Sequence, residues 1–180
     1  MISPALAHKT EAGAVALNLA DDAALVEAVR TMQARVSAYD PDAPRDDYLV
    51  EAMAPKPLAE LVVALRRDPQ FGLAMTLGSG GILVELLGDT VSLLLPCPTA
   101  QIEEALTSLR VSTLLNGYRG APAADIPALA ADLARLADYS VAKINMLQEI
   151  EINPVFVYPD GILAIDALMQ VDTDETPSQS

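Results

Sequence analysis

The sequence predicts an α+β protein with a largely antiparallel sheet, and three observations support this class. Short runs of strand-forming residues are separated by glycine, proline and aspartate breaks through the middle of the chain. Two segments with apolar residues at helical spacing follow these runs. A final pair of apolar runs flanks a turn signal near the C-terminus, which is typical of a hairpin.

A single helix is expected in the first part of the chain, with an acidic start after Asp21. Apolar residues recur there at helical spacing: Leu25, Val29, Met32 and Val36. The segment Asp40–Pro44 carries two prolines, ends the helix and forms the only clear linker. We therefore expect residues 1–44 to form one part of the protein and residues 45–172 the other.

The larger part is expected to contain short strands and then two helices. The strands are Leu49–Val50, Glu60–Leu65, Leu73–Leu77, Ile82–Leu87 and Val91–Leu95. Thr99 and Asp125 can each cap a helix, because their side chains accept hydrogen bonds from backbone N–H groups. The inward residues are Ile102, Leu106 and Leu109 in the first helix and Leu129, Leu133 and Leu136 in the second. Residues 173–180 have nothing to bury, and we expect a disordered tail.

The last hairpin brings together two oxygen-bearing side chains. Its turn signal is Tyr158–Gly161. With a two-residue loop at Asp160–Gly161, Val155 would pair with Asp166, and Asn153 would lie diagonal to Asp166 on one face, about 7–8 Å away at most. A three-residue loop would instead place the two groups on opposite faces, so this prediction depends on the register.

Asn153 and Asp166 form a candidate half-site for a metal nucleotide. Mg²⁺ takes carboxylate and amide oxygens and usually keeps waters and substrate phosphates as its other ligands. Glu151 shares the strand face of Asn153 by the period of two and is the third candidate for this site. The alternatives are an exposed Asn and Asp near a turn and a solvated edge for Glu151.

The composition limits the function classes. The formal charge of −14, from 25 acidic and 11 basic residues, opposes binding of nucleic acid, whereas a nucleotide can be neutralised locally by Mg²⁺, a few cations and backbone N–H groups. The single cysteine, Cys97, excludes an internal disulfide and a cysteine-based zinc site. Every apolar run is far shorter than the roughly 20 residues of a membrane helix, so we expect a cytoplasmic protein with no membrane partner.

Four groups of residues carry a family resemblance. They are Ser3-Pro4 with 8–15, Asp68–Gly72 with Gly78–Gly81 and Glu85, Gly117–Gly120, and Glu151–Pro154 with Asp166-Ala167. In this order they resemble the ATP-grasp part of NDP-forming acyl-CoA synthetases, the acetate/acyl-CoA ligase relatives of the succinyl-CoA synthetase beta subunit. The resemblance spans Ser3 to about Val171 and implies an ATP-grasp fold, in which ATP lies between two lobes. Residues 1–44 would be a remnant of the N-terminal lobe, and residues 45–172 the C-terminal lobe.

The resemblance also implies roles for individual residues. His8, the only histidine, would accept a phosphoryl group from ATP and relay it, with Lys9 steadying the phosphate charge, although a lone histidine can also be a surface group. Asn153 and Asp166 match the magnesium ligands. The other nucleotide-binding candidates are Met53, Glu60, Gly80, Gly81, Glu85 and Arg119. The glycines could instead form a tight strand connection, and Arg119 could pack at a helix end.

The function implied is that of a C-terminal ATP-grasp portion of an NDP-forming acyl-CoA synthetase. The whole enzyme would couple conversion of ATP to ADP and phosphate with thioester formation, through acyl phosphate and phosphohistidine. Its cofactors would be Mg²⁺ and ATP/ADP, and its partners CoA-binding and ligase domains on the same longer chain or on a partner subunit. We also expect an oligomer, and no synthetase activity from the 180 residues alone.

The alternative function is a catalytically incompetent remnant that serves as a subunit-association or regulatory module. Members of the family have a stretch with a phosphate-contacting lysine before the position of Ser3. Ala14, Ala16 and Ala52 stand where the family usually has Gly, Lys and Glu. These departures favour the alternative.

Overall fold

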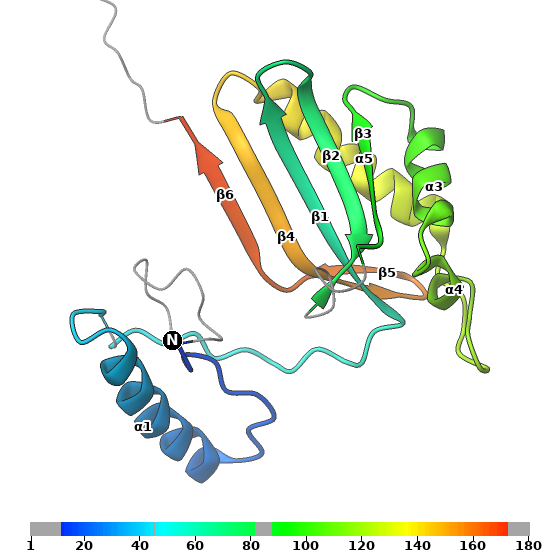
Figure 1. The fold of residues 1–180 in the computed structure, drawn as a ribbon. Helices are drawn as coiled ribbons and strands as arrows, with labels where there is room; N and C mark the ends of the chain where they lie inside the picture. Colours follow the sequence, from blue (N-terminus) through cyan, green and yellow to red (C-terminus); the bar gives the residue numbers. More distant parts are fainter. Residues whose placement is uncertain (1–11, 45, 82–87, 173–180) are drawn as a thin grey trace, which may run out of the picture. The chain divides into compact units, whose positions relative to one another are not determined.

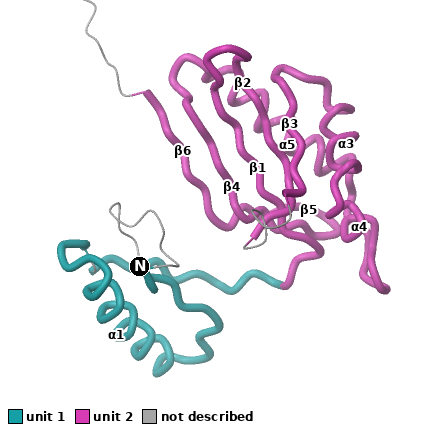
Figure 2. The backbone as a smooth tube through the Cα atoms, viewed as in Figure 1, with its two compact units in different colours: residues 1–55 teal, residues 56–180 magenta. Residues whose placement is uncertain are grey.

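The computed structural model describes residues 12–44, 46–81 and 88–172. It divides the chain into two compact units, Met1–Pro55 and Lys56–Ser180 (Figure 2). The linker at Asp40–Pro44 predicted a boundary after residue 44, whereas the first unit extends to Pro55. The strand predicted at 82–87 and the tail predicted at 173–180 lie outside the described residues.

The first unit contains the predicted helix, α1 (Asp22–Tyr39). The side chain of Asp21 accepts a hydrogen bond from the N–H of Ala24 at 2.8 Å and caps the helix. Val36 is fully buried and packs with three alanines: Ala12, Ala14 and Ala43. The strand predicted at Leu49–Val50 is wrong. Both side chains are exposed and no neighbouring strand pairs with them in the described part of the unit.

The second unit is built on one antiparallel sheet in the order β3-β2-β1-β4-β5, with β6 also paired to β4 (Figure 1). Its strands are β1 (Ala59–Asp68), β2 (Gly72–Ser79), β3 (Thr90–Leu94), β4 (Leu147–Tyr158), β5 (Gly161–Ala164) and β6 (Ala167–Val171). The predictions for β1, β2, β3 and the hairpin strands are confirmed, and β6 was not predicted. The antiparallel α+β class is confirmed as well.

Strands β5 and β6 lie on the same edge of β4 and keep one register. Val155 pairs with Ala164 in β5, and Ile152 pairs with Ala167 in β6. They therefore form one line of chain along β4, interrupted at residues 165–166. The interruption lies opposite Asn153-Pro154, and proline cannot donate a hydrogen bond to a sheet.

Three helices follow β3: α3 (Thr99–Ser108), α4 (Ser112–Leu115) and α5 (Ile126–Ala142). Helices α3 and α5 cover one face of the sheet (Figure 1). Alternate residues of the strands supply the sheet's share of the core, such as Leu61, Val63 and Leu65 in β1. The predicted inward helix residues are buried, except that Leu136 is only partly buried.

One of the two predicted helix caps is correct. The Asp125 side chain accepts a hydrogen bond from the N–H of Ala128 at 3.0 Å and caps α5. Thr99 is not a cap, because it is already the first residue of α3 and Pro98 takes the capping position. Pro98 has no side-chain group that can accept a hydrogen bond.

Candidate metal-binding site

The hairpin that carries the predicted metal ligands has a register different from the expected one. Tyr158 pairs with Gly161, not with Leu163, and Val155 pairs with Ala164, not with Asp166. The loop is Pro159-Asp160, because Pro at the second and Gly at the fourth position of Tyr158–Gly161 suit a type I turn. The difference is two residues, so the side chains keep their faces.

This register places Asn153 directly opposite Asp166. The N–H of Asn153 donates to the carbonyl oxygen of Asp166 at 3.2 Å, and the N–H of Ile165 donates to the carbonyl oxygen of Pro154 at 3.0 Å. These two bonds bridge the interruption between the paired positions Ile152 with Ala167 and Val155 with Ala164, so they bring Asn153 and Asp166 next to each other. The carboxylate of Asp166 also accepts a hydrogen bond from the N–H of Ala167 at 3.1 Å.

A glycine turn at the end of β2 approaches the same place. The N–H of Gly81 donates to the amide oxygen of Asn153 at 3.1 Å, although 72 residues separate them. The N–H of Gly80 donates to the carbonyl oxygen of Glu60 at 2.7 Å. Four predicted residues, Glu60, Gly80, Gly81 and Asn153, thus meet through backbone and side-chain hydrogen bonds.

The approach requires glycine at both positions. A Cβ atom on Gly80 would lie closer than 3.0 Å to three backbone atoms of Leu61. A Cβ on Gly81 would overlap the carboxylate of Glu60, and the φ of Gly81 is +73°, a region that other residues rarely adopt. The glycines therefore form a tight connection after β2, as the alternative interpretation predicted. This connection also contacts Asn153, a predicted metal ligand.

The open face of the sheet, opposite the helices, continues from this turn. A shallow hollow on it is lined by residues that include Ala64, Arg66, Thr76, Glu149 and Glu151. The guanidinium of Arg66 donates to the carboxylate of Glu149 at 2.7 Å. Glu151 is partly buried and shares this face with Glu149, as the period of two predicted.

The remaining predicted site residues are Arg119, Met53, His8, Lys9 and Glu85. Arg119 is exposed in the loop before α5, with its guanidinium carbon 5.2 Å from the centroid of the Tyr118 ring and a φ of +52°. Met53 is 52% exposed and belongs to the first unit. His8, Lys9 and Glu85 lie outside the described residues, so their roles stay predictions.

The donor set suits a cation that needs few protein ligands. Within 12–44, 46–81 and 88–172, no three His, Cys, Asp or Glu side chains gather closely enough to hold a metal ion. An amide oxygen and a carboxylate remain at the hairpin, with the Glu60 carboxylate beside Gly81. Mg²⁺ is usually bound by one or two protein carboxylates together with substrate phosphates and waters, so these residues fit it.

Comparison with known proteins decides the family. A family model described as the ATP-grasp domain matches residues 1–171. The chain belongs to the ATP-grasp family. A relative from Pyrococcus furiosus, the beta subunit of an ADP-forming acetate–CoA ligase, is 34% identical over 94% of this chain and 72% of its own length. The resemblance to NDP-forming acyl-CoA synthetases is thereby confirmed.

Longer relatives contain the ATP-grasp chain as a fraction of their length. A trans-feruloyl-CoA synthase from an unknown prokaryotic organism is 36% identical over 93% of this chain, which spans only 24% of that relative. The chain thus spans 24% of the synthase and 72% of the beta subunit.

Solved structures show the same fold. The acetyl-coenzyme A synthetase 1 of Ca. Korarchaeum cryptofilum, in complex with coenzyme A and Ca-AMPCP, is 33% identical with a TM-score of 0.86, over 94% of this chain and 73% of that one. A complex of the same protein with coenzyme A and Mg-AMPPCP has a TM-score of 0.79 at 31% identity, over 96% of this chain and 74% of that one. Its description places a phosphohistidine segment toward the nucleotide-binding site.

One functional candidate in the ATP-grasp chain was missed from the sequence. The carboxylate of Asp89 accepts hydrogen bonds from the hydroxyl of Ser79 at 2.7 Å and from the N–H groups of Arg110 at 2.9 Å and Val111 at 3.1 Å. Partial burial opposes ionisation of Asp89, but these hydrogen bonds outweigh it and lower the pKa of the carboxyl. The sequence showed only a Gly88-Asp89 break between strands.

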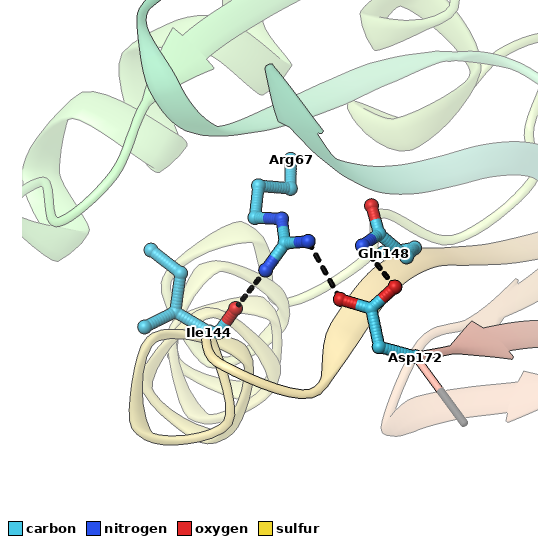
Figure 3. Close-up of polar contacts among 4 residues, drawn as sticks. All are labelled: Arg67, Ile144, Gln148 and Asp172. Carbon is cyan, nitrogen blue, oxygen red and sulfur yellow. Dashed lines mark hydrogen bonds and ion pairs between the residues drawn. The ribbon is translucent and has the colours of Figure 1, made fainter. Parts of the chain in front are cut away.

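The opposite end of the sheet holds a second polar cluster (Figure 3). One terminal nitrogen of Arg67 donates to the carbonyl oxygen of Ile144 at 3.0 Å and the other to the carboxylate of Asp172 at 2.7 Å. The side-chain amide of Gln148 donates to the other Asp172 oxygen at 2.5 Å. The hydrogen bonds from Gln148 and Arg67 lower the pKa of Asp172.

None of the helices in the described residues has the length and apolar character needed to cross a bilayer.

Proposed function

We propose that this chain is the nucleotide-binding ATP-grasp portion of an ADP-forming acyl-CoA synthetase. The observation that carries the proposal is the meeting of Gly81, Asn153 and Asp166 at one end of the open sheet face. Relatives with this domain include ADP-forming acetate–CoA ligases and an acetyl-coenzyme A synthetase described with Ca-AMPCP and coenzyme A.

Each group in the cluster has a task suited to a metal nucleotide. Asn153 and Asp166 would hold Mg²⁺, and Glu151 would support them from the same strand face. Bound there, Mg²⁺ supplies neutralisation of the phosphate charge. Gly80 and Gly81 would let the backbone come close to the phosphates, and Glu60, beside Gly81, would border the same position.

The remaining nucleotide contacts are proposed from the matching positions. Met53 would offer its backbone near the adenine, and Lys9, Glu85 and Arg119 would face the phosphates or border the cleft. His8 would be the phosphoryl carrier. One of its ring nitrogens would form a bond to the γ-phosphorus as the bond from that phosphorus to the bridging oxygen breaks, and ADP would leave. A relative described with a phosphohistidine segment supports this role.

The whole enzyme would also need a CoA site and a ligase domain. One relative is the beta subunit of an ADP-forming acetate–CoA ligase, and another ADP-forming acetate–CoA ligase is a longer chain of which this chain spans 24%, so partners of either kind are supported. The reaction would convert ATP to ADP and phosphate while a carboxylic acid and CoA form a thioester. We also propose that the protein is cytoplasmic and that it assembles into an oligomer.

A second candidate is a remnant that associates with other subunits without catalysis. Ala14, at a position where a glycine is usual, is fully buried in the first unit beside Val36. A residue that fills a core is consistent with packing rather than phosphate contact. This candidate predicts no specific cation site at the hairpin, which separates it from the first.

Calorimetric titration of the chain with Mn²⁺ or Mg²⁺, with and without ADP, tests the proposal. We expect weak binding by the unmodified chain and its loss in a double variant, Asn153→Ala with Asp166→Asn. Asp160→Asn is the matched control, because it removes one carboxylate from the turn of the same hairpin. Equal binding by the double variant and the unmodified chain would exclude the site.

A further inference from the structure

We propose that Ser79 and Asp89 are positioning residues for this metal site. They would hold the glycine turn so that the N–H of Gly81 fixes the orientation of the Asn153 amide. This inference rests on the proposed function, because it concerns how a metal ligand is prepared. It adds two residues to those implied by the family resemblance.

Ser79 and Asp89 are joined by two hydrogen bonds. The N–H of Ser79 donates to the carbonyl oxygen of Asp89 at 3.0 Å, and the hydroxyl of Ser79 donates to the Asp89 carboxylate at 2.7 Å. A hydrogen bond to an ionised acceptor is stronger than one between neutral groups. The last residue of β2 is therefore held by both the backbone and the side chain of the residue that precedes β3.

The Asp89 carboxylate is in turn attached to the helical layer. It accepts from the N–H groups of Arg110 and Val111, in the turn between α3 and α4. Val111 and Leu109, which flank Arg110, belong to the buried core. A carboxylate held from two sides has a fixed position, so the hydroxyl of Ser79 donates to a fixed acceptor.

The two residues after Ser79 carry this constraint to Asn153. Gly80 is bonded through its N–H to the carbonyl oxygen of Glu60, and Gly81 through its N–H to the amide oxygen of Asn153. A rotated Asn153 amide would present its NH₂ group to the N–H of Gly81, which is unfavourable. The Gly81 contact thus selects the orientation in which the oxygen points to the turn, and a carbonyl oxygen has a second lone pair for a cation.

The chain of contacts is continuous from the core to the predicted ligand. Groups behind a metal ligand commonly set its orientation, and their loss reduces affinity. Ser79 and Asp89 act on Asn153 through Gly80 and Gly81, whereas a direct partner would bond to the ligand itself. The expected effect of cutting the chain at Ser79 is therefore a loss of about 3- to 10-fold in metal affinity, below the 10- to 100-fold typical of a direct partner.

A second hydroxyl contact between the same strands provides a control. The hydroxyl groups of Thr76 and Ser92 lie 2.9 Å apart, and Ser92→Ala would remove this contact without reaching Gly81. Ser79→Ala removes the side-chain link to Asp89 but leaves Asp89 bonded to Arg110 and Val111. Ser79→Thr keeps the hydroxyl and should restore the behaviour of the unmodified chain.

The experiment compares the full chain and the three variants by two readouts. The first is exchange of the Gly81 amide hydrogen in metal-free protein, followed by NMR. The second is the dissociation constant for Mn²⁺ from calorimetry. We expect Ser79→Ala to speed exchange at Gly81 severalfold and to weaken Mn²⁺ binding by about 3- to 10-fold, while Ser79→Thr and Ser92→Ala leave both unchanged.

Each contrary result has a definite meaning. Unchanged exchange at Gly81 in Ser79→Ala would overturn the link through Ser79. Faster exchange with unchanged Mn²⁺ affinity would overturn its effect on the ligand, as would an equal loss of affinity in Ser92→Ala. If the unmodified chain binds no Mn²⁺, the proposed metal site itself fails, and the exchange of Gly81 still shows whether the contact is held through Ser79.

Discussion

The two ends of the sheet in the second unit gather polar groups in different ways. At the end formed by Arg67, Gln148 and Asp172, a guanidinium and an amide of the protein meet a carboxylate (Figure 3). At the other end, glycine backbone approaches the amide of Asn153, which lies opposite Asp166. The first end supplies its own cation and ties β6 to β1. The second gathers oxygen ligands and suits a cation that comes with a nucleotide.

This difference distinguishes a polar cluster that stabilises the fold from one that is suited to bind a ligand. The guanidinium of Arg67 donates to a backbone carbonyl and to a carboxylate, and such a pair stabilises the ends of strands. Gly80 and Gly81 lack side chains where the turn lies against Leu61 and Glu60, and this close packing brings the N–H of Gly81 to the amide of Asn153.

The largest effect is expected at Gly80. Gly80→Ala would place a Cβ closer than 3.0 Å to the backbone of Leu61, which cannot move without disturbing β1. We expect a loss of about 1–3 kcal/mol in the free energy of unfolding, measured in urea. Gly161→Ala is the control, because its Cβ would meet nothing within 4 Å and its φ is not positive. An equal loss in both variants would show that the turn is not tightly packed.

Acid should weaken the second unit through carboxylates at both ends. The pKa values of Asp89 and Asp172 are lowered from the ordinary 3.8 by their hydrogen bonds. Their folded pKa values therefore lie below the unfolded ones, so their contribution is full above pH 3.8 and is lost as the pH falls through the folded values. The free energy of unfolding in urea should depend less on pH for Asp89→Asn than for the unmodified chain. The comparison runs from pH 5 down to the lowest pH at which both proteins are still folded. Identical slopes would contradict this.

A smaller effect is expected at Arg67. Arg67→Ala removes the bonds to Ile144 and Asp172, so the end of β6 should open more often. Amide exchange of Met169 and Val171 should become severalfold faster, whereas exchange at Gly81 should not change. Faster exchange at both ends would mean that the two clusters are coupled rather than separate.

The smallest effect is expected at Arg66. Its side chain is 71% exposed, and its ion pair with Glu149 is screened by water. Arg66→Gln should change the free energy of unfolding by about 0.5 kcal/mol or less, as for most exposed pairs. A loss above that of Gly80→Ala, in the same urea assay, would contradict this ranking.

The sequence predicted what local patterns encode. The spacing of apolar residues placed α1, α3 and α5, and the Pro-Asp-Gly signal placed the last hairpin. The register was wrong by two, because proline at the second turn position makes Pro159-Asp160 the loop. The pair Asn153 and Asp166 survived this error, since a shift of two keeps each side chain on its face.

Contacts between distant segments could not be predicted in the same way. Arg67 and Asp172 are 105 residues apart, and nothing near either one indicates the other. Asp89 appeared only as a break after Gly88, and its partners lie in a helix turn 21 and 22 residues later. Strand β6 was missed because all five of its residues are exposed, so burial gives them no alternating pattern.

We expect only one of the two ends of the sheet to bind a divalent cation. Titration of the ¹⁵N-labelled chain with Mn²⁺, a paramagnetic substitute for Mg²⁺, distinguishes the two ends. Amide signals of Gly81, Asn153 and Asp166 should broaden at the lowest Mn²⁺ concentrations, while those of Gln148 and Asp172 stay sharp. Broadening first at Gln148 and Asp172, or equally at both ends, would contradict it.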